Sequence, residues 1–287
     1  MYPFSSYTAF LWCILASVVV TSSVSAQTEN SFDPKKLDTY LNELGHNQRF
    51  MGTVAIDSAG SDVYSHSVGF ISAAEDTVLA DQQTIYRIGS ITKTFTAVMI
   101  MQLVEEGKLS LSTSLARFYP EIPHVQRVTI EHLLRHQSGI PDLSASTLPE
   151  KWLRETPTKQ QKLDLFRGLD SEFEPGSEES YSNTNYVVLE FIIEEVTGES
   201  YADQLEKRIT EPLGLERTRF GDSIDVRQNE AASFEFEGSR WKRLPAIDPS
   251  ISGGAGGVVS TPGDLTDFIY ALFRGDLVSQ KSLRTMT

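Results

Sequence analysis

Apolar residues recur along the chain in two patterns, and each pattern predicts a different kind of element. Short segments rich in β-branched and aromatic residues predict strands, whereas apolar residues spaced three or four positions apart predict helices. The predicted strands are residues 50–57, 63–71 and 84–88, with short strands and loops over 215–247. The predicted helices are residues 33–45, 90–106, 111–118, 129–135, 159–169, 186–196, 200–210 and 262–273, with another from about residue 279.

The order of these elements indicates the fold class. A Ser-Ala-Gly-Ser turn at 58–61 separates the first two strands, which are therefore expected to form a hairpin. A long helical section follows the third strand, and short strands return after it. This order predicts an α+β fold: an antiparallel sheet flanked by helices, with an inserted all-helical domain. The glycine-rich stretch 252–257 is interpreted as a flexible elbow, because its spacing fits no phosphate-binding motif.

Two of the predicted helices, 90–106 and 186–196, are apolar on nearly all sides. A helix of this kind is expected to be buried. Lys93 lies near the start of the first one, and a buried ammonium costs free energy unless it has a partner or a function. The hydrophobic pattern therefore makes Lys93 a candidate functional residue.

Composition narrows the possible functions. The 287 residues are 40% apolar, enough for a sizeable core, and the formal net charge is −14. Because no cluster of Lys and Arg offsets this charge, we expect no nucleic-acid partner. We interpret the net negative charge as a feature that keeps the protein soluble.

Cys13 is the only cysteine, so the rest of the chain has no thiol for a disulfide or a metal site. His132 and His136 are interpreted as a partly exposed histidine pair on one helix rather than as metal ligands.

The N-terminal residues resemble a targeting segment. Residues 8–20 are uncharged and apolar, and small residues follow them up to Ala26. This pattern predicts a signal peptide over residues 1–26 with cleavage after Ala26. An uncleaved anchor is the alternative, although the apolar run is shorter than the ~20 residues that a membrane span needs. We expect residues 27–287 to be periplasmic or secreted, without a stable membrane anchor.

Ser90 and Lys93 have the spacing of a nucleophile and a base. Residues three positions apart on a helix lie on the same face, about 5–6 Å apart at Cβ. A serine at a helix start with a lysine one turn later can therefore act as an activated nucleophile. The spacing alone is weak evidence, since Ser239 and Lys242 repeat it in a polar stretch with no helix after it.

A second pair, Tyr181 and Asn183, strengthens this interpretation. It also precedes a buried helix and follows a turn, and the helical section separates it from Ser90. The same Tyr-x-Asn spacing occurs at Tyr40 and Asn42, where it falls within an amphipathic helix and is interpreted as structural.

From about residue 35 onward the chain resembles the serine β-lactamase and penicillin-binding-protein superfamily, in particular class C β-lactamases and the related esterases and D-alanyl-D-alanine carboxypeptidases. Several stretches carry the resemblance beyond the two motif pairs. They are Tyr86–Lys93, Leu133–Pro141, Tyr181–Tyr186, Glu211–Leu215, and Gly253–Gly257 with Ser260–Pro262. The resemblance implies the β-lactamase/transpeptidase-like form of the α+β fold.

The resemblance also implies a role for each motif residue. Ser90 attacks a carbonyl and carries an acyl group, while Lys93 and Tyr181 share the general-base work. Asn183 is expected to hydrogen-bond the substrate amide or Lys93, and the Ser90 backbone N–H to stabilise the oxyanion. No metal or cofactor is implied. The implied substrate is an ester, a β-lactam or a D-Ala-D-Ala-like amide, as a small molecule or as part of peptidoglycan.

One motif of that superfamily, Lys/His-x-Gly, does not occur after Asn183 in this sequence. We therefore expect residues 27–287 to form a C-terminally truncated hydrolase domain that lacks the last strands. Two hypotheses follow: an exported acyl-serine hydrolase, or a catalytically silent truncated relative or binding module of the same fold. The residues leave esterase, carboxypeptidase and β-lactamase activity open, and they indicate no oligomeric state.

Overall fold

The computed structural model describes residues 32–73, 77–122, 125–143, 149, 152 and 155–287. The predicted signal peptide, residues 1–26, lies outside these residues. The chain divides into two units, Met1–Pro34 and Lys35–Thr287, and the second unit contains every element discussed below beyond the first residue of α1. Within the described part of the chain, no helix is both long enough and apolar enough to cross a membrane.

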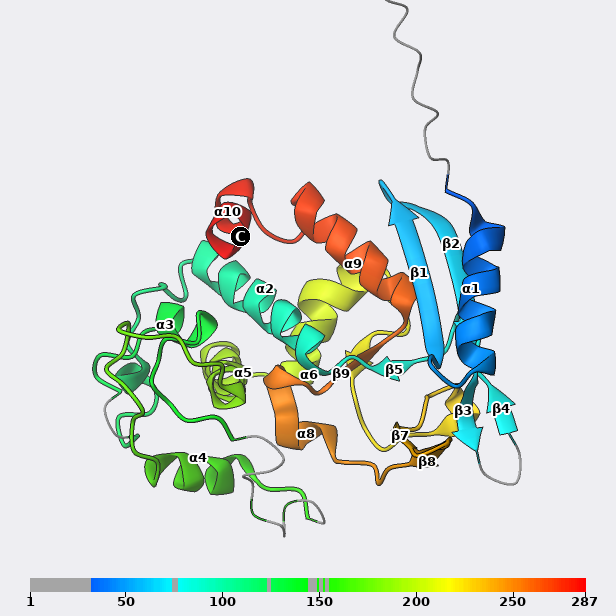
Figure 1. The fold of residues 1–287 in the computed structure, drawn as a ribbon. Coiled ribbons are helices and arrows are strands. Elements are labelled where there is room, and N and C mark those ends of the chain that lie inside the picture. Colours follow the sequence, from blue (N-terminus) through cyan, green and yellow to red (C-terminus); the bar gives the residue numbers. More distant parts are fainter. Residues whose placement is uncertain (1–31, 74–76, 123–124, 144–148, 150–151, 153–154) are drawn as a thin grey trace, which may run out of the picture. The chain divides into compact units, whose positions relative to one another are not determined.

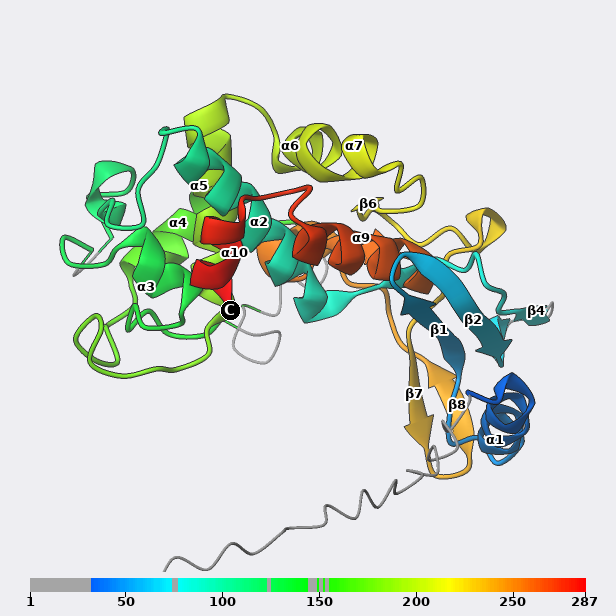
Figure 2. The same ribbon diagram turned by 90° about the horizontal axis from the view of Figure 1, so that it is seen from above.

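The first elements form the predicted helix and hairpin. Helix α1 (Pro34–His46) precedes strands β1 (Gly52–Ser58) and β2 (Ser61–Val68), which pair antiparallel. The Tyr64 hydroxyl of β2 donates to Asp38 of α1 at 2.7 Å, which ties the helix to the hairpin. Helix α9 (Pro262–Arg274) lies on the other side of the hairpin (Figures 1 and 2).

The predicted strand 63–71 is wrong in its extent, because the chain turns at Gly69. Its φ of +88° is favourable only for glycine, and it ends β2 at Val68. The next residues form a separate strand, β3 (Phe70–Ala73), which pairs with β4 (Thr77–Leu79).

Strands from distant parts of the sequence form a three-stranded sheet. Strand β9 (Val258–Ser260) lies between β5 (Tyr86–Arg87) and β6 (Arg219–Phe220), and both pairs are antiparallel. The helical section separates β5 from β6 in the sequence, so the α+β prediction with its helical insertion is confirmed. Instead of one sheet, however, the described strands form four small ones, of which the last is the β7 (Phe234–Glu237) and β8 (Arg240–Arg243) hairpin.

The stretch 252–257 is not a flexible elbow. Helix α8 (Pro249–Ser252) and a 3₁₀ turn (Gly253–Ala255) occupy most of it, and two glycines separate this turn from β9. The helix 111–118 was also predicted wrongly, since only a 3₁₀ turn forms there (Leu115–Arg117). Ser114 bridges to Thr129 at that point, so hydrogen bonds to a neighbouring segment replace those of a helix.

The remaining helices follow Ser90 in the chain. They are α2 (Thr92–Glu105), α3 (Ile130–Leu134), α4 (Lys159–Arg167), α5 (Asn183–Thr197), α6 (Tyr201–Leu205), α7 (Glu211–Leu213) and α10 (Gln280–Met286), with a π-helical turn over Glu206–Thr210. The predicted burial of α2 and α5 is confirmed by their many inaccessible side chains. Phe95 of α2 stacks on Phe268 of α9, with ring centroids 3.8 Å apart. Helix α2 therefore connects the helical section to the hairpin side of the molecule (Figure 1).

Candidate active site

Ser90 lies at a turn between strand and helix. Strand β5 ends at Arg87, Gly89 adopts a φ of +51°, and a 3₁₀ turn over Gly89–Ile91 leads into α2. The positive φ explains the glycine, because other residues are strained there. Lys93 lies in the first turn of α2, and its Nζ donates to Ser90 Oγ at 3.3 Å. The spacing of three residues thus places the amine at the hydroxyl, as predicted.

The second motif reaches the same point from α5. The Tyr181 hydroxyl lies 2.8 Å from Ser90 Oγ, and Asn183 Oδ1 accepts from Lys93 Nζ at 2.8 Å. The Lys93 ammonium also lies 4.9 Å from the centre of the Tyr181 ring. The structure therefore brings all four sequence-predicted residues into one contiguous cluster.

Lys93 is buried, and its ammonium has three partners. Besides Ser90 and Asn183, the backbone carbonyl of Ala255 accepts from Nζ at 2.8 Å. An ammonium has three hydrogens to donate, so this set satisfies it. A buried ammonium without partners would cost free energy. These three hydrogen bonds offset that cost for Lys93.

Asp142 is a site residue that sequence reasoning missed. Its Oδ1 accepts from both the backbone N–H and the side-chain amide of Asn183, at 2.7 and 2.9 Å. These bonds orient the Asn183 amide so that its oxygen points to Lys93. Nothing local in the sequence relates Asp142 to Asn183, which lies 41 positions further along the chain.

His136 is also a neighbour of the site, and its predicted place on a helix is wrong. Helix α3 ends at Leu134, and His136 beyond it has a φ of +56°. Its ring packs 4.6 Å from the Tyr181 ring, and its Nδ1 accepts from the Ser182 N–H at 3.1 Å. Burial, together with the charge of Lys93, lowers the pKa of His136, which favours the neutral imidazole.

His132, the other member of that pair, has a local role. It completes a capping box with Thr129 at the start of α3. In the described part of the chain, no group of three or more His, Cys, Asp and Glu side chains is arranged to hold a metal ion.

A cavity of about 380 Å³ opens beside Ser90. Its walls are mainly apolar, and Ser90 and Asn183 are among the residues that line it. The other lining residues are Arg87, Gly89, Leu143, Val187, Ser233, Leu244, Pro245, Ile247, Asp248, Pro249, Ile251, Ser252, Ala255 and Gly256. The cluster therefore faces a space that can hold the acyl part of a substrate.

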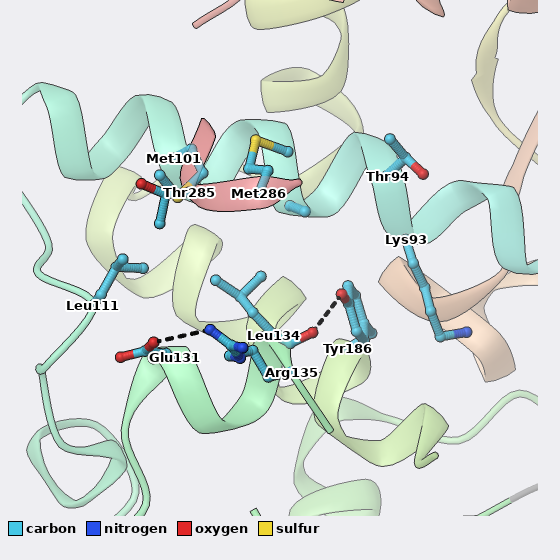
Figure 3. Close-up of a pocket in the computed structure, with 11 residues that line it drawn as sticks. Lys93, Thr94, Met101, Leu111, Glu131, Leu134, Arg135, Tyr186, Thr285 and Met286 are labelled. Carbon is cyan, nitrogen blue, oxygen red and sulfur yellow. Dashed lines mark hydrogen bonds and ion pairs between the residues drawn. The ribbon is translucent and has the colours of Figure 1, made fainter. Parts of the chain in front are cut away.

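A second cavity, of about 260 Å³, lies along α2. Leu134, Met101 and Met286 line it, and Tyr186 closes one side by donating from its hydroxyl to the Leu134 carbonyl at 3.0 Å. Figure 3 shows Lys93 at its edge, with the amine turned away from Met286. The ammonium thus points toward Ser90 and not into this second cavity.

Comparisons with known proteins identify the family of this chain. The family model described as Beta-lactamase matches residues 37–287. The chain belongs to the Beta-lactamase family, the group of serine β-lactamases and penicillin-binding proteins.

Three similar proteins illustrate the breadth of the family. Penicillin-binding protein 4* of Bacillus subtilis (strain 168) is 33% identical over 265 residues, which cover 86% of this chain and 58% of that protein. Teichoic acid D-alanine hydrolase of Staphylococcus aureus (strain MRSA252) is 30% identical over 257 residues, covering 88% of this chain and 61% of that protein. The crystal structure of D-amino acid amidase from Ochrobactrum anthropi SV3 with D-phenylalanine superimposes with a TM-score of 0.75 at 27% identity, covering 86% and 74% of the two chains. The chain thus spans about three fifths of the length of these curated relatives.

Proposed function

We propose that the protein is an acyl-serine hydrolase with Ser90 as its nucleophile. The observation that carries this proposal is the position of Ser90 Oγ, 2.8 Å from the Tyr181 hydroxyl and 3.3 Å from Lys93 Nζ. A serine hydroxyl is a weak nucleophile until a neighbouring group takes its proton. Tyr181 supplies a proton acceptor beside Ser90 Oγ, and Lys93 places a positive charge beside the same oxygen.

The proposed reaction has two steps. In the first, Ser90 Oγ attacks the carbonyl carbon of the substrate while its proton passes to the oxygen of Tyr181 in its phenolate form. The leaving alcohol or amine then takes up that proton, and the acyl group stays on Ser90 as an ester. In the second step, water attacks the ester and restores the free hydroxyl. Lys93 stabilises the negative charge of the Tyr181 phenolate before the proton transfer, and Asn183 holds Lys93 in place.

The cavity beside Ser90 suggests which substrates to test first. Its walls are largely apolar, including Leu143, Val187 and Ile251, and this lining suits an uncharged acyl group. The named activities of two relatives, on teichoic acid D-alanine and on D-amino acid amides, widen the range to esters and amides of D-amino acids. β-Lactams and peptidoglycan-like amides complete the proposed substrate classes.

A fluorescent fluorophosphonate tests the proposal directly. We expect the 287-residue chain to be labelled on Ser90 and to hydrolyse p-nitrophenyl esters. Ser90→Ala should lose both reactions, whereas Ser239→Ala, which changes the other Ser-x-x-Lys serine, should keep them. Equal labelling of the Ser90→Ala variant would refute the role of this residue.

The second candidate is a catalytically silent relative that serves as a binding module of the same fold. The same assay decides between the two. A folded wild-type chain without labelling or ester turnover would support the silent protein, and Ser90-dependent turnover would exclude it.

We also propose that the protein is exported to the periplasm or beyond, on the basis of the pattern over residues 1–26. Mass spectrometry of the protein from an exporting host should find an N-terminus at Gln27. An intact N-terminus in exported protein would contradict the cleavage.

A further inference from the structure

The segment 249–257, which comprises α8, the following 3₁₀ turn and two glycines, connects the cavity wall to Lys93. Pro249, Ile251 and Ser252 line the cavity beside Ser90. Further along the segment, the Ala255 carbonyl accepts from the Lys93 ammonium at 2.8 Å. The position of this carbonyl is therefore part of what holds Lys93 beside Ser90.

The peptide groups of Gly254 are held from two sides. On one side, the Gly254 N–H donates to Oε2 of Glu190, which is buried in α5, at 2.8 Å. On the other, the Gly254 carbonyl accepts from Thr96 Oγ1 of α2 at 2.7 Å. The Tyr201 hydroxyl completes this network at 2.7 Å from Thr96 Oγ1. Helices α2 and α5 thus hold the residue immediately before the Ala255 carbonyl.

The glycines of this segment permit the close approach of Glu190. A Cβ atom at Gly253 would lie 1.8 Å from Glu190 Oε2, and the φ of Gly253 is +47°. A Cβ atom at Gly254 would lie 2.9 Å from the Tyr186 carbonyl oxygen. Any side chain at either position would displace the segment from α5. The glycine pair is therefore matched to a carboxylate in this position.

The buried carboxylate is costly, which argues that it has a role. Burial raises the pKa of Glu190 to about 7, and the positive charge of Lys162 on α4 opposes this rise. Lys162 is itself buried, and its ammonium donates to the Ser250 carbonyl of the same segment. An apolar side chain in place of Glu190 would avoid the desolvation cost altogether.

We propose that Glu190 is a positioning residue for the nucleophile. By accepting from the Gly254 N–H it fixes the segment 249–257, and the Ala255 carbonyl of that segment then holds the Lys93 ammonium at Ser90 Oγ. This inference rests on the proposed function, because it assigns Glu190 to the reaction at Ser90. Glu190 itself contacts neither Ser90 nor the cavity.

The test compares rates of Ser90 labelling by the fluorophosphonate in the full chain. Glu190→Met keeps a flexible side chain of similar length and removes the carboxylate acceptor, and we expect it to slow labelling about tenfold or more, since small misplacements of catalytic groups have large effects. The midpoint of the pH–rate profile should also move, because the carbonyl partner of Lys93 moves. Glu190→Gln retains an acceptor and should stay within about threefold of wild type. Glu195→Gln, a matched control on the exposed face of α5, should label at the wild-type rate.

The outcomes separate positioning from simple stability. A folded Glu190→Met variant with the wild-type rate and pH profile would overturn the inference, and so would a loss of labelling by one factor at every pH. If Glu190→Met is unfolded by circular dichroism, Thr96→Val removes the other bond to Gly254. Slow labelling of this variant is expected, and an unchanged rate would overturn the inference.

Hydrogen exchange distinguishes failure of this inference from failure of the proposed function. A wild-type chain that is not labelled overturns the hydrolase proposal, and with it the catalytic role of Glu190. Exchange of the 249–257 amides still reports on the contact with Glu190 in that case. We expect faster exchange in Glu190→Met, and unchanged exchange would show that Glu190 does not hold the segment.

Discussion

At the scale of single residues, the site depends on how one ammonium group is shared. Lys93 Nζ contacts a hydroxyl, a side-chain amide oxygen and a backbone carbonyl, from Ser90, Asn183 and Ala255. Each acceptor comes from a different element, so displacement of any one of them changes where the charge lies. Asp142 extends this dependence by orienting Asn183.

Tyr181 carries the most direct prediction at this scale. Tyr181→Phe removes the oxygen that lies 2.8 Å from Ser90 Oγ and keeps the ring beside His136. We expect ester turnover to fall about 10²-fold or more, the range for loss of a general base. Because the Tyr181 side chain is half-exposed, the urea midpoint should change little.

Tyr40→Phe is the matched control for this change. Tyr40 belongs to the other Tyr-x-Asn triplet, and its side chain is exposed on α1. Its variant should turn over esters at the wild-type rate. A Tyr181→Phe variant with wild-type turnover would show that the Ser90 proton goes elsewhere.

At the scale of elements, Glu190 is buried where α5 packs on the segment 249–257. Its carboxyl group makes the free energy of unfolding depend on pH. The pKa of Glu190 is raised to about 7 from an ordinary 4.5, so the native chain binds this proton more tightly than the unfolded chain. The sign follows: the contribution of Glu190 to stability is largest at low pH and is lost as pH rises to about 7. The charged groups that act on Glu190 or respond to it are Lys159 and Lys162 of α4, Glu194 of α5 and Tyr201 of α6.

Glu190→Gln should remove this pH dependence. Relative to wild type, we expect the free energy of unfolding of the variant to increase by about 2–3 kcal/mol between pH 5 and pH 8, from the size of the pKa shift. Urea unfolding at the two pH values measures it. Glu195→Gln, which changes a half-exposed carboxylate, should show less than about 0.5 kcal/mol of such change. Equal differences for the two variants would refute the burial effect.

At the scale of the whole molecule, α2 joins the helical section to the strands. Leu103 on this helix is fully buried. Leu103→Ala should lower the free energy of unfolding by about 2–5 kcal/mol, through lost burial and the cavity left behind. Because α2 packs on α5 and, through Phe95, on α9, the helical section and the hairpin side should still unfold together.

Urea unfolding followed by circular dichroism and by tryptophan fluorescence measures this effect. Phe273→Ala, on the exposed face of α9, is the control and should cost less than about 0.5 kcal/mol. Two separate transitions in the Leu103→Ala variant would contradict the view that α2 unites the molecule.

Elements with a local signal can be predicted from the amino-acid sequence. Helix periodicity and turn sequences act over a few residues. Patterns of this range therefore predict the helices around α2 and α5, the first hairpin, and the contact of Ser90 with Lys93. The pairing of Ser90 with Tyr181 was inferred across 91 positions only because two motifs occurred together.

The tertiary structure alone decided the features that depend on long-range contact. Strand β9 is three residues long, and β5 and β6 define it through hydrogen bonds that no local pattern specifies. Asp142, the Ala255 carbonyl and the buried Glu190 escaped prediction for the same reason. A backbone carbonyl has no sequence signature. The role of Glu190 on the apolar helix α5 can be inferred only once its contact with the Gly254 N–H is known.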